Sequence, residues 1–316
     1  MSELKLTEKE IAALRAIARS GERHVGDVAQ ALGSVYPVAS RVVASLAGKG
    51  FVNLSRTGRS KSVSLSDTKH AQHFRRLLAE FGHMNLEHVL SDSSLEVLSH
   101  ILDGPLGRKE LTERSSLSDK TVKVALRKLR AVGVIVSKGR FRYALSERFR
   151  LLGEFITEFT AYLNQKAAER FAADSVILWQ REREFIIRTE AEKSERNFFP
   201  TATPVFHQYG IELLLPRHRY YFHSPYRSTL RVEDIILHTL ALDRDSTRNI
   251  LSVLLLWEKN KQWLSVEYLS EEAEKYELRD VIERLEGYRR TEGEVRPEHF
   301  PSWREYVSRA KEYGLA

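Results

Sequence analysis

The sequence repeats one order of elements, and this repeat limits the folds open to the chain more than any other feature. Residues 5–66 contain a helical pattern, a shorter one and a third that ends at Gly50, and two short β-rich segments follow. The same order returns at 90–146, where the third helical pattern ends at Gly133. Glycine tolerates the left-handed conformation with which helices commonly end. We therefore expect two copies of one small fold in the first half.

Aligning the two glycines brings the apolar positions of the two third helices into register. Leu46 then aligns with Leu129, and Val43 aligns with Leu126. Apolar residues at three- and four-residue spacing form the buried stripe of an amphipathic helix. The outward positions of the two copies differ, so the repeat predicts one kind of core that carries two different surfaces.

Helix, short helix, longer helix and then a hairpin with a basic tip is the order found in winged helix-turn-helix domains. The sequence resembles that family, most closely its tandem or regulator-like members among microbial transcription factors. The resemblance implies binding to double-stranded DNA. The third helix of each copy would enter the major groove, where base edges carry a distinguishing pattern of donors and acceptors, and the hairpin cations would meet phosphates or the minor groove.

The residues expected to contact DNA follow from these positions. They are Tyr36, Ser40, Arg41, Arg56, Arg59 and Lys61 in the first copy and Ser118, Lys120, Lys123, Arg127, Lys138, Arg140 and Arg142 in the second. The third helix of the second copy is far more basic than that of the first, which makes the second copy the stronger candidate reader. Winged helices also serve as protein–protein modules, and this alternative stays open for either copy.

Charge separates the two halves of the chain. The formal net charge is +7, but residues 1–150 carry 26 Lys and Arg against 15 Asp and Glu, whereas the remainder carries 24 against 28. A basic half favours a polyanionic partner. The chain has no cysteine, which excludes disulfides and thiolate sites. We expect a cytoplasmic protein without a signal peptide or membrane segment, because the most apolar run near the C-terminus, Ile250–Trp257, is far too short to span a bilayer.

These observations predict an α+β chain of two winged helix-turn-helix domains, connecting helices and a C-terminal mixed α/β domain. The predicted segments are a first winged helix at 1–67, a connecting helix at 68–88, a second winged helix at 89–147, a linker helix at 148–173 and the C-terminal domain at 174–316.

An apolar stripe runs along the linker helix at 148–173. Its members are Leu152, Phe155, Ile156, Phe159, Leu163 and Ala167. Such a stripe must be covered, either by a second copy in a homodimer or by the helix's own chain, and the pattern favours neither.

In the C-terminal segment, hydrophobic alternation predicts several strands, among them Ile211–Leu215, whereas 191–204 reads as irregular. Helical patterns follow from residue 230 onward. The stretch 209–240 is similar to the C-terminal regions of AbiE-type antitoxins and regulators, in which a Tyr-Ser-Pro-like turn leads into a helix that begins with Leu and an acid. Here His223–Pro225 leads to Leu230 and Glu233–Asp234.

The AbiE likeness implies a repressor of its own promoter that counteracts a nucleotidyltransferase-like toxin through its C-terminal domain. The usual member of that family has one winged helix, whereas this chain repeats the pattern. Toxin neutralisation is therefore the alternative to a regulator whose C-terminal domain senses a ligand or binds a partner.

A basic-aromatic cluster in the second half could bind a partner or an anionic ligand. Its candidate residues are Arg217, Arg219 and Tyr221. The other interpretation is that one side of a strand is apolar and the cations face water.

Enzyme motifs are missing from the sequence: there is no P-loop, G-x-G-x-x-G, G-x-S-x-G or H-E-x-x-H pattern. We expect no cofactor, no metal and no enzymatic activity. Two weaker alternatives are a metal site from scattered histidines and a nuclease built on dispersed acids. The residues concerned are His207, His218, His223 and His238 for the metal and Asp234, Glu258 and Glu267 for the nuclease.

Overall fold

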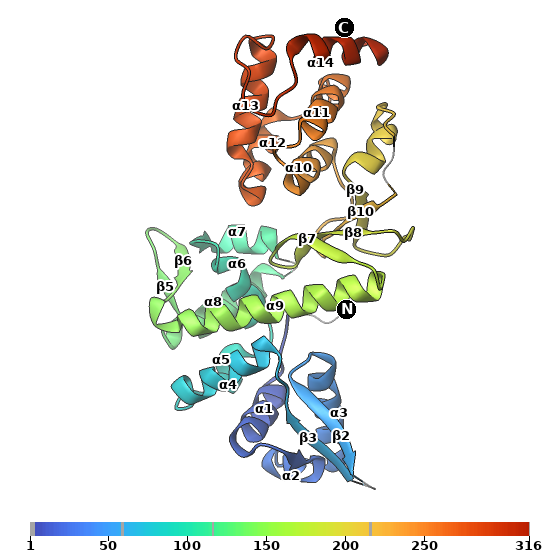
Figure 1. Cartoon of the computed structure of the whole chain (residues 1–316). Coiled ribbons are helices and arrows are strands. Elements are labelled where there is room, and N and C mark those ends of the chain that lie inside the picture. Colours follow the sequence, from blue (N-terminus) through green and yellow to red (C-terminus); the bar gives the residue numbers. More distant parts are fainter. Residues whose placement is uncertain (1–3, 58–59, 116, 215–216, 316) are drawn as a thin grey trace. The chain divides into compact units, whose positions relative to one another are not determined.

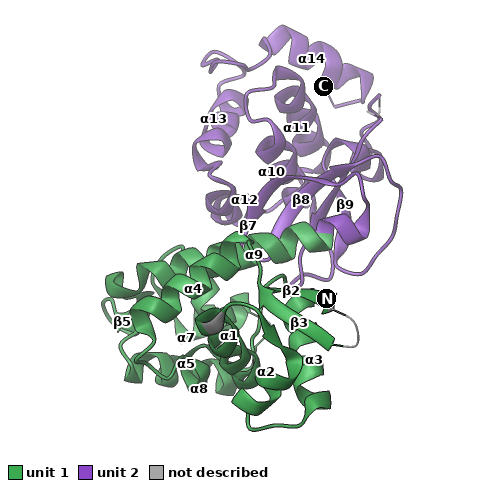
Figure 2. Cartoon of the chain, turned by 60° about the horizontal axis from the view of Figure 1, so that its bottom comes forward, with its two compact units in different colours: residues 1–167 green, residues 168–316 purple. Residues whose placement is uncertain are grey.

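The structure is a computed structural model that describes residues 4–57, 60–115, 117–214 and 217–315. It divides into two compact units, residues 1–167 (unit 1) and 168–316 (unit 2), which are described separately (Figure 2). Helices and small antiparallel sheets make up both units, so the predicted α+β class is confirmed. Among the described residues, no helix is long and apolar enough to cross a membrane.

The first module of unit 1 has the element order that the sequence predicts (Figure 1). Its elements are α1 (Glu8–Ser20), β1 (Arg23–His24), α2 (Val25–Ala31), α3 (Tyr36–Gly48), β2 (Val52–Thr57) and β3 (Ser60–Leu65). A capping box starts α1: the Thr7 N–H donates to Glu10 Oε2 at 2.7 Å, and the Glu10 N–H donates to Thr7 Oγ1 at 3.2 Å.

The second module repeats this order. Its elements are α6 (Ser94–Ile101), β4 (Leu106–Gly107), α7 (Arg108–Arg114), α8 (Asp119–Ala131), β5 (Ile135–Ser137) and β6 (Arg142–Leu145). The two sheets have equivalent strand orders, β1-β3-β2 and β4-β6-β5. Gly50 and Gly133, which follow the third helices, both have positive φ angles, 75° and 73°. The repeat read from the sequence is therefore a repeat of structure.

Three helices and a 3-10 turn connect or follow the modules: α4 (Lys69–Phe81), α5 (Leu86–Leu90), η1 (Glu147–Phe149) and α9 (Arg150–Phe171). The apolar stripe of α9 is buried within the chain itself, from Leu152 to Leu163, in one continuous core that includes residues of both modules. Phe159 lies against the rings of Phe51 and His70, with centroids 4.9 and 5.3 Å apart.

Packing on its own chain is thus the outcome for the α9 stripe. The stripe therefore gives no support to a homodimer through 148–173, which stays a prediction. Gly50 allows this close packing: a Cβ atom at that position would lie 2.2 Å from the Tyr162 ring of α9.

Unit 2 begins with a four-stranded antiparallel sheet of order β7-β8-β10-β9. The strands are β7 (Val176–Arg181), β8 (Glu184–Thr189), β9 (Phe198–Thr201) and β10 (Arg219–His223). The helical elements are η2 (Thr203–Tyr209), α10 (Val232–Leu242), α11 (Thr247–Asn260), α12 (Val266–Ala273), η3 (Glu274–Tyr276), α13 (Arg279–Arg290) and α14 (Trp303–Glu312). These helices share a second hydrophobic core, which includes Leu237, Leu254 and Tyr288.

One predicted strand was wrong. Residues 211–214 form no strand, whereas Phe198–Thr201, within a segment read as irregular, forms β9. The reason is pairing: β10 has β8 on one side and β9 on the other, so it has no free edge for a further strand. Ile211 is instead completely buried in the second core.

Candidate nucleic-acid interface

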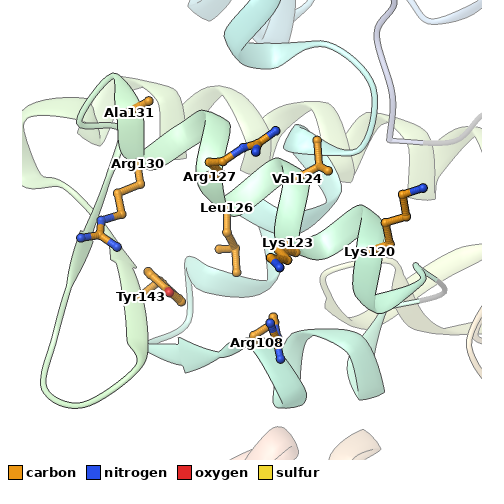
Figure 3. A pocket seen from close by; sticks show the side chains of 9 residues that line it. All are labelled: Arg108, Lys120, Lys123, Val124, Leu126, Arg127, Arg130, Ala131 and Tyr143. Atoms are coloured by element: carbon orange, nitrogen blue, oxygen red, sulfur yellow. The ribbon is translucent and has the colours of Figure 1, made fainter.

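The outward face of α8 is basic. Val122, Ala125, Leu126 and Leu129 are buried, and this fixes the rotation of the helix. The exposed side therefore carries four cations, and none of them pairs with a carboxylate of the described residues: Lys120, Lys123, Arg127 and Arg130 (Figure 3). Three of the four, Lys120, Lys123 and Arg127, are residues that the sequence predicts to contact DNA, and Arg130 is an addition from the structure.

Other polar side chains of α8 have structural roles. Ser118, a predicted contact, caps the helix by accepting from the Thr121 N–H at 3.2 Å. Lys128 is half-buried and donates to the Ser91 carbonyl and hydroxyl, both at 3.2 Å. Burial lowers the Lys128 pKa from its ordinary value, an effect opposed by Asp92 and Glu8. Lys128 thus belongs to the interior of unit 1 rather than to the basic face.

A groove of about 740 Å³ runs along this face of α8. Its lining residues are Arg108, Lys120, Lys123, Val124, Leu126, Arg127, Arg130, Ala131 and Tyr143 (Figure 3). The lining contains five cations and no carboxylate. Arg108 Nε, from α7, is held 3.0 Å from Asp119 Oδ1, which links the start of α7 to the start of α8. A basic rim around an apolar floor suits a polyanion whose surface also offers apolar groups.

The second hairpin joins β5 to β6 beside α8. Lys138 and Arg140 are exposed, as predicted, and the Lys138 N–H donates to the Arg142 carbonyl at 2.9 Å. Arg142 differs from the expectation, because its guanidinium contacts Pro105 O at 2.9 Å and Glu110 Oε1 at 3.0 Å. Arg142 therefore links the hairpin to Pro105 and to α7, while its side chain stays 51% exposed, so its contact with DNA remains a prediction.

Phe141, which the sequence analysis did not select, lies at the tip of this hairpin. Its side chain is 73% exposed and its φ is +62°. The Arg140 guanidinium carbon lies 5.5 Å from the centre of the Phe141 ring. The sequence does show an aromatic residue between two arginines just after Gly139. Alternation of residue types at this point predicts a strand, however, and not an exposed hairpin tip.

The corresponding face of the first module is nearly uncharged. Tyr36 and Arg41 are exposed and Ser40 is half-buried, so the predicted residues do lie on the outward side of α3. Lys49, at the end of this helix, turns inward and lies 2.7 Å from Glu10 Oε1. Burial raises the pKa of Glu10, but hydrogen bonds from Lys49, Ser45 and Thr7 outweigh it, so the pKa is lowered overall.

Two cations face each other across the first hairpin. Arg56 and Lys61 are directly opposite in the β2–β3 register, and both are exposed. Like charges in opposite positions of an antiparallel pair are destabilising, and a bound anion removes that repulsion. The third predicted cation of this hairpin, Arg59, lies outside the described residues.

Of the partner site predicted in unit 2, Tyr221 is buried, whereas Arg217 and Arg219 lie on the surface in ion pairs. Arg217 is paired with Glu190 at 3.0 Å, and Arg219 is paired with Glu192. Tyr221 is only 3% exposed, and its hydroxyl donates to Ala191 O at 3.3 Å. Tyr221 is not available to a partner, because β10 lies between β8 and β9 and its last three residues, Tyr221 to His223, are all buried.

Unit 2 instead contains an ion-pair network that sequence patterns did not reveal. Arg227 Nη1 lies 2.9 Å from Asp234 Oδ1, and Arg227 also pairs with Glu272 at 2.5 Å and with Glu184 at 3.7 Å. Lys275 pairs with Glu184. Burial raises the pKa of Glu184, but the Lys275 ammonium outweighs it and the pKa is lowered overall. The network ties β8, α10 and α12 together, so these groups hold the fold.

The metal and nuclease alternatives gain no support from this geometry. His238 is buried between Thr201 Oγ1 at 2.7 Å and Tyr276 Oη at 2.8 Å, and burial holds its pKa well below the ordinary value. Asp234 belongs to the Arg227 network, and Glu258 pairs with Arg289 at 2.9 Å. In the described part of the chain, no three His, Asp or Glu side chains are grouped to hold a metal ion.

Comparison with known proteins adds one finding. No curated protein matches the chain. A family model described as HVO_2833_C, C-terminal, matches residues 195–315, a segment that starts after β8 and includes every helix of unit 2 from α10 onward, so this part of the chain is similar to that family.

Proposed function

We propose that the protein is a DNA-binding transcriptional regulator that acts in the cytoplasm and reads duplex DNA chiefly with α8 and the second hairpin. One observation carries the proposal: the four exposed cations of α8 surround a groove without any acidic lining residue. Cations gathered on one face repel one another and attract a polyanion, whose binding removes the repulsion. The winged-helix order of elements supports the same conclusion.

The chemistry of the face fits the two kinds of contact that DNA recognition needs. A helix about 10–12 Å across enters the major groove, and Lys or Arg side chains near its N-terminus reach the O6 and N7 atoms of guanine. Lys120 and Lys123 hold that position on α8, and exposed Val124 beside them offers an apolar contact for a thymine methyl group. Arg140 on the hairpin is placed for phosphate.

Unit 2 is assigned the sensing or partner-binding part of this function. Toxin neutralisation stays an alternative that rests on the AbiE resemblance alone, since no contact described above favours it. A neighbouring toxin gene and a stable complex with its product would support that alternative.

The test is binding of the full-length chain to genomic fragments, followed by anisotropy titrations of one selected duplex at several salt concentrations. We expect the logarithm of the association constant to fall linearly with the logarithm of salt, with a slope of about 0.9 per phosphate contacted. Lys123→Ala should change which sequences are preferred, whereas Arg140→Ala should weaken all sequences alike.

Lys311→Ala, which removes an exposed cation of α14 in unit 2, is the matched control for loss of one charge. Equal affinities of the wild type, Lys123→Ala and Arg140→Ala would exclude the second module as the reader. Fragments that show no enrichment upstream of genes would argue against a regulatory role.

A further inference from the structure

Phe141 is the largest apolar side chain presented by the second hairpin, and nothing in its own unit requires it there. The ring is 73% exposed, so it contributes almost nothing to the core of unit 1. A single exposed apolar side chain is ordinary on a protein surface, but this ring stands between Arg140 and Arg142 in the sequence and beside a cationic groove.

The backbone of Phe141 is also in an unfavourable region. A φ of +62° is rare for residues other than glycine, asparagine and aspartate, and it is an outlier for a bulky side chain. Conformations of this kind persist where the surrounding structure imposes them, and they cluster at functional sites. Here the anchoring of Arg142 to Pro105 and Glu110 holds the strand that follows Phe141.

The charges around the ring identify the partner. Arg140 lies 5.5 Å from the ring centre, and the Lys138 side chain is exposed at the same tip. The cationic groove of α8 lies beside this hairpin, with Arg130 and Tyr143 on the side nearest to it (Figure 3). An apolar wedge flanked by cations is the device with which proteins enter the minor groove and unstack a base step.

We propose that Phe141 is a minor-groove wedge that unstacks and kinks duplex DNA next to the site held by α8. This proposal rests on the proposed function and deepens it. While α8 occupies the major groove, the hairpin tip reaches the adjacent minor groove, where Arg140 and Lys138 meet the narrow, electronegative walls.

The experiment uses the full-length protein and a duplex that it selects from a random library. 2-Aminopurine replaces single adenines along the duplex, and its fluorescence rises when a base step is unstacked. The wild type should raise the signal at one step, and end-labelled duplex should show a bend of about 20–90° by energy transfer. Phe141→Ala should abolish both signals and lower affinity by roughly 5- to 150-fold, the range for loss of base–aromatic stacking.

Two further variants separate the wedge from folding. Phe141→Gly removes the ring and suits the positive φ, so it should fold at least as well as the wild type yet lose both signals. Phe141→Leu keeps an apolar wedge and should retain much of the kink.

Failure of the wedge and failure of DNA binding give different results. If the wild type binds duplex with sensitivity to Lys123→Ala but leaves every 2-aminopurine stacked and the duplex straight, the wedge is wrong and the proposed function stands. If Phe141→Gly kinks DNA as the wild type does, the wedge is likewise wrong. If the wild type binds no duplex, both proposals are overturned.

Discussion

The two modules of unit 1 share one order of helices and strands but differ in the surface of their third helices. The outward side of α8 presents four cations, whereas that of α3 presents Arg41 as its one exposed cation among the described residues. Positions that face the core are constrained by packing in both copies, and positions that face outward are not. The difference is what we expect if, as proposed, α8 carries most of the DNA contacts and α3 carries few.

The first module makes more contacts with the buried core of unit 1 through the residues that end its third helix. Lys49 donates to Lys5 O at 2.8 Å and to both carboxylate oxygens of Glu10, so its charge stabilises the module from inside. Phe51 packs against four other aromatic rings of α4 and α9. We infer that the first module positions the second, and four predictions test this division of roles.

The largest expected effect is on stability. Phe51→Ala should lower the free energy of unfolding of unit 1 by about 3–5 kcal/mol, because it empties the centre of the aromatic cluster. Val134, which occupies the equivalent position after Gly133, is also buried, and Val134→Ala should cost only about 1–2 kcal/mol. Urea unfolding followed by circular dichroism measures both.

The chain supplies its own reference for this measurement, because all four tryptophans lie in unit 2: Trp179, Trp257, Trp263 and Trp303. Their fluorescence transition should stay in place in both variants. Equal losses from Phe51→Ala and Val134→Ala would contradict the inference that the first module is the more deeply anchored one.

The next effect is on DNA affinity. Replacing Lys120, Lys123 and Arg127 together with alanine should weaken duplex binding by about 10³-fold or more, and the salt slope should fall by about 3. Arg41→Ala, the corresponding change on α3, should weaken it less than about tenfold. Anisotropy titrations compare the two, and a larger loss from Arg41→Ala would reverse the assignment of reader and scaffold.

Acid should destabilise unit 1 through His70, as it should unit 2 through His223 and His238, whose pKa values burial also lowers. Burial lowers the pKa of His70 to about 4, and its neutral ring donates from Nε2 to Lys49 O at 3.0 Å. Since the folded pKa lies below the unfolded one, the stabilisation is complete above pH 6.5 and is lost as the pH falls toward 4. By pH 5 the loss should be roughly 2 kcal/mol.

Hydrogen exchange at pH 7.5 and pH 5 measures this loss, once intrinsic exchange rates are corrected for. The carboxylate of Glu10 does not interfere between pH 7.5 and pH 5. Its pKa is lowered in the folded state, so the stability that it contributes is lost only as the pH falls through about 4.5. His70→Gln keeps an N–H donor without the titration, so it should flatten the pH dependence. A wild-type profile that stays flat from pH 7.5 to pH 5 would show that His70 is protonated without cost.

The smallest effect concerns the first hairpin. Arg56→Ala with Lys61→Ala should leave stability unchanged or raise it by a few tenths of a kcal/mol, because two opposed cations are removed. Affinity should fall by less than about tenfold, equally for all duplexes, and the salt slope should fall by at most about 2. A change in sequence preference would mean that the first module also reads bases.

Local patterns predicted much of unit 1 because its rules are local. Helical spacing identified the buried stripes of α3 and α8, and Gly50 and Gly133 marked where these helices end. The same reasoning misplaced one strand of unit 2, because strand pairing depends on which edge of β10 another segment reaches first. It also grouped Arg142, which bonds to Pro105 and Glu110, with the hairpin cations Lys138 and Arg140.

The sequence by itself determined the repeat, the α+β class and the direction in which each third helix turns its apolar side, because spacing along one element fixes those properties. Only the tertiary structure decided that Lys49 and Arg142 serve the fold, that the α9 stripe is covered by its own chain, and that Phe141 stands exposed at a hairpin tip. Those outcomes depend on contacts between residues far apart in sequence, and no local spacing encodes them.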